Sequence, residues 1–234
     1  MYLKDGAVKR FHRKCTFFIA LIAALGGSFF SEILFPKEAQ AERKWFQGFS
    51  QKLKYGTAVI IIDGEEKARV SLNNSQFEVN VDIEEGANII QILLLDAEGN
   101  PHQRKVLSYK NFQENVISEV GIRSSIAAAL SHYEPSKASI LEQSANEDFD
   151  HLEKCIEAIC GVLEELELVS SLSQLELIDR LLAGENVLSI FQDKLGSETT
   201  NIVIRELKNS ESFPKEKDGN INLSVLNELV FRLK

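Results

Sequence analysis

The hydrophobic pattern of this 234-residue chain changes its period once, near residue 110. Between Thr57 and Tyr109, short runs rich in β-branched residues are separated by turn-forming residues. From Gln113 onward, apolar residues recur three and four positions apart. Alternation is typical of strands, and a period of 3.6 is typical of helices. The sequence therefore predicts an α+β chain, with a small antiparallel β module followed by an α-helical bundle.

Five strands are expected in the β module, at residues 59–62, 68–72, 77–83, 89–95 and 104–109. The third alternates apolar with polar side chains, which predicts one buried and one exposed face. The fourth is apolar on both faces apart from Gln91, as expected of a central strand that is covered on two sides. Between the first two, Asp63-Gly64 is typical of a type I′ hairpin, because both residues tolerate a positive φ.

Turn and core residues of the β module follow a recognisable order. A strand begins at Phe77, a glycine turn follows at Gly86, Asn88 leads an apolar strand, and an aspartate precedes Gly99-Asn100. In this order the segment resembles the bacterial extracytoplasmic immunoglobulin-like modules of the glucodextranase-domain-B type. The resemblance covers about 50 of the 234 residues. It implies an Ig-like β-sandwich and says almost nothing about function.

The resemblance leaves the start of the module open. The opening strands of the family should precede Thr57, but residues 42–56 contain only a mixed aromatic and basic stretch. We therefore expect a connector there and an incomplete sandwich, whose open face is covered by the helices that follow. The predicted divisions are 1–41, signal peptide or membrane anchor; 42–56, connector; 57–110, Ig-like module; 112–208, helical domain; and 209–234, linker and C-terminal helix.

The N-terminus has the charge order of a secretory signal. The first fourteen residues carry five cations against Asp5, and residues 16–30 carry no charge. Fifteen helical residues span roughly 22 Å, which is short of the ~30 Å hydrocarbon core of a bilayer. Ala39-Gln40-Ala41 is a small-x-small site. A signal peptidase is therefore expected to cleave between Ala41 and Glu42.

An uncleaved anchor is the alternative, because apolar residues 33–35 could extend the span to residues 16–35. The positive flank would then keep the N-terminus in the cytoplasm. Both interpretations place the rest of the chain outside the cytoplasm, in the periplasm or on the cell surface. Loss of residues 1–41 removes six of the 26 cations and three of the 35 anions, which leaves a net charge of −12. Such a surface repels nucleic acid, so no nucleic-acid partner is expected.

The strongest helical signal lies between residues 152 and 169. A broad apolar stripe recurs there at heptad spacing, formed by Leu152, Cys155, Ile156, Ile159, Val162, Leu163, Leu166 and Val169. A stripe of this width favours packing against helices of the same chain. A homo-oligomeric coiled coil through this helix is the alternative, although three heptads are short for one. Further helices are expected from Val116 to Leu130, from Leu175 to Leu195 with an interruption at Gly184 and a stop at Gly196, and from Leu223 to Leu233.

Candidate metal ligands are few. Glu147, Asp148 and His151 form the best cluster, since Glu147 and His151 are four residues apart and share a helical face. A metal site would need ligands from a second helix, and the sequence contains no matching pair. Cys155 and Cys160 point in different directions on a helix, so an internal disulfide is not expected. Cys155 is interpreted as a small core residue, with an interchain bridge as the alternative.

Catalytic motifs are missing from the sequence, which has no Gly-x-Ser-x-Gly elbow, phosphate-binding loop, His-Glu-x-x-His helix or Cys-x-x-Cys pair. We expect no cofactor and no enzymatic activity. The favoured hypothesis is an exported cell-envelope protein that acts as a protein-interaction module. One alternative is a small hydrolase of cell-wall or glycan polymers, which a cleft with two carboxylates about 5 to 9 Å apart would favour. The other is a membrane-anchored oligomeric scaffold.

Overall fold

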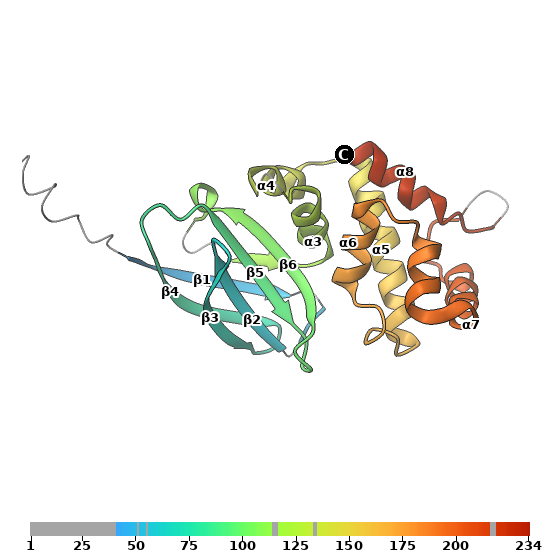
Figure 1. Cartoon of the computed structure of the whole chain (residues 1–234), viewed down its shortest axis with the longest axis horizontal. Coiled ribbons are helices and arrows are strands. Elements are labelled where there is room, and N and C mark those ends of the chain that lie inside the picture. Colours follow the sequence, from blue (N-terminus) through green and yellow to red (C-terminus); the bar gives the residue numbers. More distant parts are fainter. Residues whose placement is uncertain (1–40, 51, 55, 114–116, 133–134, 216–218) are drawn as a thin grey trace, which may run out of the picture. The chain divides into compact units, whose positions relative to one another are not determined.

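The computed structural model describes residues 41–50, 52–54, 56–113, 117–132, 135–215 and 219–234. The chain divides into two compact units, residues 1–41 and residues 42–234. The second unit is α+β, with strands followed by helices (Figure 1). The predicted signal segment and Ala39 lie outside the described residues. Within the described ranges, no helix combines the length and the apolar character that crossing a membrane requires.

Two sheets form the β module (Figure 1). The first has the order β4 (Gln76–Ile83), β1 (Glu42–Ser50), β7 (Ser118–Val120). The second has the order β3 (Glu65–Leu72), β2 (Gly56–Ile62), β5 (Ile89–Leu95), β6 (Pro101–Ser108). Neighbouring strands are antiparallel except β1 and β7, which are parallel. A short 3-10 helix, η1 (Tyr109–Asn111), follows β6.

The two sheets share one apolar core. Strand β4 buries Phe77, Val81 and Ile83 while its even-numbered side chains face solvent, as the alternation predicted. The turn between β2 and β3 has a φ of 48° at Asp63 and 87° at Gly64, which confirms the predicted type I′ hairpin. The five predicted strands are confirmed as β2 to β6.

Strand β1 corrects the interpretation of residues 42–56 as a connector. It pairs with β4 along eight residues and supplies Phe46 to the core, where this ring stacks on Phe112 with centroids 4.5 Å apart. Gly48 packs directly against the ring of Phe77. A Cβ atom at this position would collide with that ring and would lie 2.7 Å from the carbonyl oxygen of Ser118. The strand could not be recognised in the sequence, because its inner face carries Gly48 and the half-buried Lys44 in place of apolar side chains.

Helices begin later than the predicted boundary at residue 112. Residues 118–120 form β7, and α3 (Ile122–Leu130) starts after Gly121. Val116, where the predicted helix begins, lies outside the described residues. Val120 and Ile126 were assigned to this one helix, but Val120 belongs to the core of the β module and Ile126 to the helical core. The strands of the β module therefore extend from residue 42 to residue 120, which corrects the predicted divisions 57–110 and 112–208.

The other helices are α4 (Pro135–Gln143), α5 (Glu147–Glu165), α6 (Gln174–Ala183), α7 (Val187–Asn209) and α8 (Ser224–Leu233). Helix α4 was not predicted. The expected interruption at Gly184 ends α6 in a left-handed cap with φ of 101°. The expected stop at Gly196 is confirmed as a break, because Gly196 has a non-helical φ of 76° and ψ of 164° and divides α7 into two helical segments. The predicted C-terminal helix is confirmed as α8.

Helix α5 runs through the core of the helical part. Its N-terminus is capped by Asn146, whose side chain accepts a hydrogen bond from the Phe149 amide at 3.1 Å. Leu152, Ile156 and Ile159 are fully buried, and α5 contacts α3, α7 and α8. The predicted apolar stripe is therefore covered within the chain from Leu152 to Leu163, whereas Leu166 and Val169 are half-buried.

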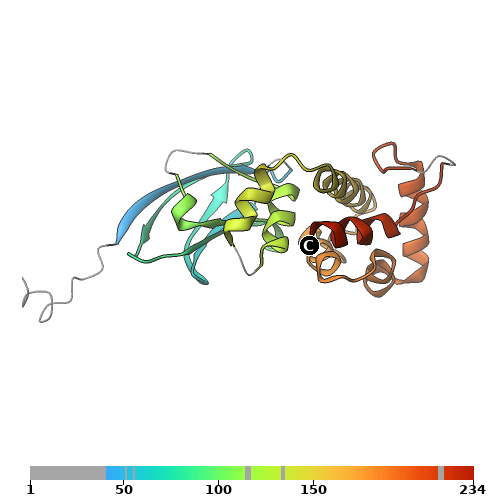
Figure 2. The same ribbon diagram turned by 90° about the horizontal axis from the view of Figure 1, so that it is seen from above.

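Strand β6 joins the β module to the helices. Helices α3, α4 and α6 contact this strand, and Figure 2 shows α3 and α4 lying against the β module. The Arg104 guanidinium pairs with Asp179 of α6, and Lys105 donates to Glu142 of α4 at 2.6 Å. The hydroxyls of Ser124 and Ser125 on α3 bond to the backbone of Arg104. Backbone and side chains of one strand thus hold three helices.

Candidate functional site

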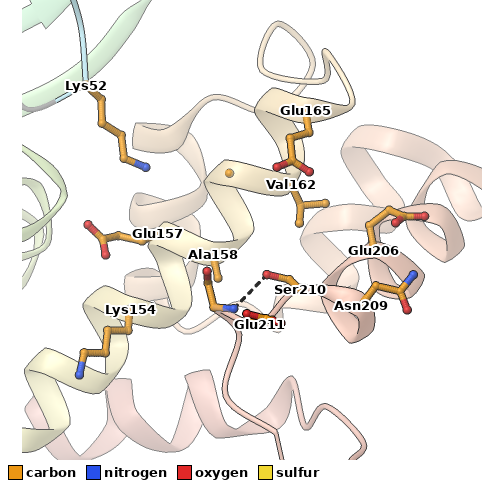
Figure 3. Close-up of a pocket in the computed structure, with 12 residues that line it drawn as sticks. Lys52, Lys154, Glu157, Ala158, Val162, Glu165, Glu206, Asn209, Ser210 and Glu211 are labelled. Atoms are coloured by element: carbon orange, nitrogen blue, oxygen red, sulfur yellow. Dashed lines mark hydrogen bonds between the residues drawn. The ribbon is translucent and has the colours of Figure 1, made fainter.

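A groove of about 630 Å³ lies between α5, the end of α7 and the loop that joins β1 to β2 (Figure 3). Helix α5 supplies one wall and the floor, with Lys154, Glu157, Ala158, Gly161, Val162 and Glu165. The residues that end α7 supply another wall, with Glu206, Asn209, Ser210, Glu211 and Ser212. Lys52 comes from the β1–β2 loop. Side chains that are distant in the sequence therefore meet around one open space.

Small residues form the floor of the groove. Ala158, Gly161 and Val162 are three and four positions apart, so they lie on one face of α5. Val162 belongs to the buried stripe, Ala158 borders it, and both are buried. Gly161 has no side chain, and a Cβ atom added there would meet nothing within 4 Å. The helix backbone is therefore accessible at the floor of the groove.

The loop that carries Lys52 is fastened to the β module. The Ser50 hydroxyl accepts hydrogen bonds from the amides of Lys52 at 3.3 Å and Leu53 at 2.8 Å. The same hydroxyl donates to the side-chain oxygen of Gln103 on β6 at 2.7 Å, and both residues are buried. The backbone at Lys52 is thus held by an internal hydrogen-bond network.

Acidic groups outnumber basic ones in the groove. Glu157, Glu165, Glu206 and Glu211 face Lys52 and Lys154 among its lining residues. Figure 3 shows both lysines and Glu157 at one end, and Glu165 and Glu206 at the other. Helices α5 and α7 both end at this groove, and helix C-termini carry partial negative charge. The end with Glu165 and Glu206 is therefore acidic, although Glu206 pairs with Arg205 at 3.0 Å and the last turn of α7 also carries Lys208.

Of the three predicted metal ligands, Asp148 is engaged in an ion pair, whereas Glu147 and His151 share one pocket. The Asp148 carboxylate accepts two hydrogen bonds from Arg232 of α8, at 3.0 and 2.9 Å. This ion pair holds the pKa of Asp148 below its usual range. Glu147 and His151 line a different shallow pocket together with the cation Lys154. In the described part of the chain, no three His, Cys, Asp or Glu side chains are arranged to hold a metal ion.

Cys155 and Cys160 are both buried and free. Burial raises the pKa of the Cys155 thiol to about 11 and that of the Cys160 thiol to about 12. A thiol with a high pKa forms little thiolate near neutral pH, and thiolate is the reactive form. The arrangement supports the interpretation of Cys155 as a core residue.

Residue 42 of the predicted cleavage site is exposed at the start of β1, next to exposed Ala41.

Sequence reasoning missed the groove, because its residues come from three separate segments. Ser210, Glu211 and Ser212 lie in a stretch that was interpreted as a polar linker, and Lys52 lies in the predicted connector. One signal was available: Gly161 interrupts the strongest helical segment without ending it. A glycine inside a helix that does not break there often serves a close approach.

No protein-family model, curated protein or solved structure matches the chain.

Proposed function

We propose that the chain is an exported cell-envelope protein that binds a partner protein in the groove between α5 and α7 and catalyses no reaction. The observation that carries this proposal is the groove itself, in which a loop of the β module and two helices surround an exposed stretch of helix backbone. Clefts are common binding sites in proteins.

The setting of the groove carboxylates favours binding over hydrolysis. Glu165 and Glu211 are exposed, and Glu157 and Glu206 are half-buried. A glycoside hydrolase needs one carboxyl group in an apolar, water-poor position, so that it stays protonated and acts as the acid. Groups in contact with water instead contribute to the attraction and orientation of a charged partner.

The strand order supports an Ig-like β module. In an Ig-like sandwich, strands B and E pair in one sheet, and strands C′, C, F and G form the other. Assigning β1 to strand B gives β4 as E and the order β3-β2-β5-β6 as C′-C-F-G. The place beside strand B is then taken by β7, which is parallel to β1. Such modules are common in extracytoplasmic interaction proteins, which agrees with a binding role.

The start of β1 supports export with cleavage. The compact unit begins at Glu42, directly after the predicted cleavage site. The Glu42 carboxylate lies 2.5 Å from the Lys44 amine and accepts from the Tyr109 hydroxyl at 3.3 Å. Cleavage after Ala41 would therefore leave β1 and its contacts intact.

Two measurements on native cells test the proposal. Intact mass of the chain from the envelope fraction should correspond to a start at Glu42, whereas recovery in the cytosol would contradict export. On a native gel of a mild envelope extract, the wild-type chain should migrate in a larger complex. Gly161→Trp, which fills the groove, should migrate at its own mass. Equal migration of the two would refute the groove as the binding site.

A further inference from the structure

Gly161 occupies a position where nothing in the described chain requires a glycine. It lies inside α5, it does not have the positive φ that favours glycine, and a Cβ atom would touch no neighbour within 4 Å. A glycine in a helix interior lowers helix stability relative to alanine. The position is therefore unfavourable for the fold, and the space above it is open to a second chain that approaches the helix backbone closely.

The charged residues that line this space are mainly acidic. The first turn of α5 carries Glu147, Asp148 and Asp150, which suits the positive end of a helix, but its last turn has no basic residue and carries Glu165 in the groove. Glu206 stands near the end of α7 and faces the same space, where it already pairs with the exposed Arg205 at 3.0 Å. Such solvent-accessible ion pairs contribute little stability, so this carboxylate can still accept from a second cation. A carboxylate at a helix C-terminus is locally unfavourable, so a bound cation would stabilise Glu165 most.

We propose that the groove receives a segment of a partner protein that carries at least two Lys or Arg side chains. The backbone of this segment lies over Gly161, and its cations face Glu165 and Glu206. The inference rests on the proposed function and names the chemistry of the partner. Lys52 and Lys154 at the opposite end fix the direction of the segment, because they repel its basic side chains.

The test is a selection of displayed random peptides of about twelve residues on the purified full chain. Enriched peptides are synthesised and titrated by fluorescence anisotropy. We expect at least two Lys or Arg in each. Affinity should fall about tenfold or more for Gly161→Trp and for the double variant Glu165→Gln/Glu206→Gln, which lose close approach and charge-assisted contacts, respectively. Raised salt should weaken binding to the wild-type chain.

The matched control is Glu198→Gln, which removes an exposed carboxylate of the same helix α7 outside the groove and should leave affinity unchanged. Circular dichroism and melting curves show whether Gly161→Trp is folded, and the double variant tests the charge without adding bulk. The inference would be overturned if the enriched peptides shared an acidic or apolar consensus. It would also be overturned if they bound Gly161→Trp as well as wild type, or if no peptide depended on the groove. The proposed function would be contradicted separately, if the wild-type chain and Gly161→Trp migrated alike on the native gel.

Discussion

At the scale of single residues, glycine is required by packing at one position and not at another. Gly48 is required by packing, because the ring of Phe77 and the Ser118 carbonyl leave no room for a Cβ atom. Gly161 is required by neither packing nor conformation. Sequence alone cannot separate these cases, since the difference depends on what lies beside each residue in space.

Replacement of Gly161 by alanine should therefore stabilise the chain. Alanine reduces the entropy of the unfolded state and its Cβ atom enters open space, so the free energy of unfolding should rise by about 0.5–1 kcal/mol. Urea unfolding followed by circular dichroism measures this change. Gly48→Ala is the matched control and should lower the free energy by about 1–3 kcal/mol through overpacking. Destabilisation by Gly161→Ala would show a structural need for this glycine.

His102 on β6 gives a second residue-level prediction. Burial lowers the pKa of His102, and the nearby carboxylates of Glu164 and Asp96 oppose this effect. Because the folded chain favours the neutral ring, stability is fully present above the ordinary pKa of 6.5 and declines as pH falls below it. The slope from this residue should not exceed about 1.4 kcal/mol per pH unit.

The measurement for His102 compares wild type with His102→Asn by urea unfolding between pH 8 and pH 5. The difference between the two curves isolates this side chain from the carboxylates that also titrate. We expect the variant to lose less stability on acidification. Parallel curves would mean that His102 titrates alike in the folded and unfolded chains.

At the scale of elements, the sequence predicted those whose residues follow one clear period. Strand β4 alternates without exception and α5 has a broad stripe, so both were predicted, although α5 ends at Glu165 and the predicted stripe extends to Val169. Strand β1 was missed because Gly48 and Lys44 stand on its inner face. Strand β7 was missed because three residues are too few to show a period and its neighbour is a distant strand.

The contact between β6 and α4 tests how the elements are joined. Lys105 and Glu142 are largely buried, and the Lys105 amine also donates to the Glu119 carbonyl at 3.3 Å. Lys105→Ala leaves the Glu142 carboxylate buried without its partner, which should cost about 1–3 kcal/mol in urea unfolding. Lys105→Met with Glu142→Leu should recover much of this loss.

The control for this contact is Arg43→Ala, which removes an exposed ion pair with Asp82 and should change stability by no more than about 1 kcal/mol. An equal effect of Lys105→Ala and Arg43→Ala would contradict the role of the β6–α4 contact in stabilising the fold.

At the scale of the whole second unit, the groove exists only because distant segments meet. Lys52 precedes β2, Glu165 ends α5, and Glu206 stands in the last turn of α7. Each is an ordinary surface residue in the sequence, since single charged residues have no periodicity to detect. The class α+β could be predicted, but the groove could be found only from the packing of the helices against each other and beside the β1–β2 loop.

The most direct test of a protein-binding groove is photocrosslinking in the native cell. A photoreactive phenylalanine in place of Glu165 should form a covalent adduct with one protein, and the adduct should disappear when Gly161→Trp is added. The same probe in place of Glu198 should give no such adduct. A crosslink from residue 165 that survives in the Gly161→Trp background, or none at all beside a folded and exported chain, would contradict the groove as the site of partner binding.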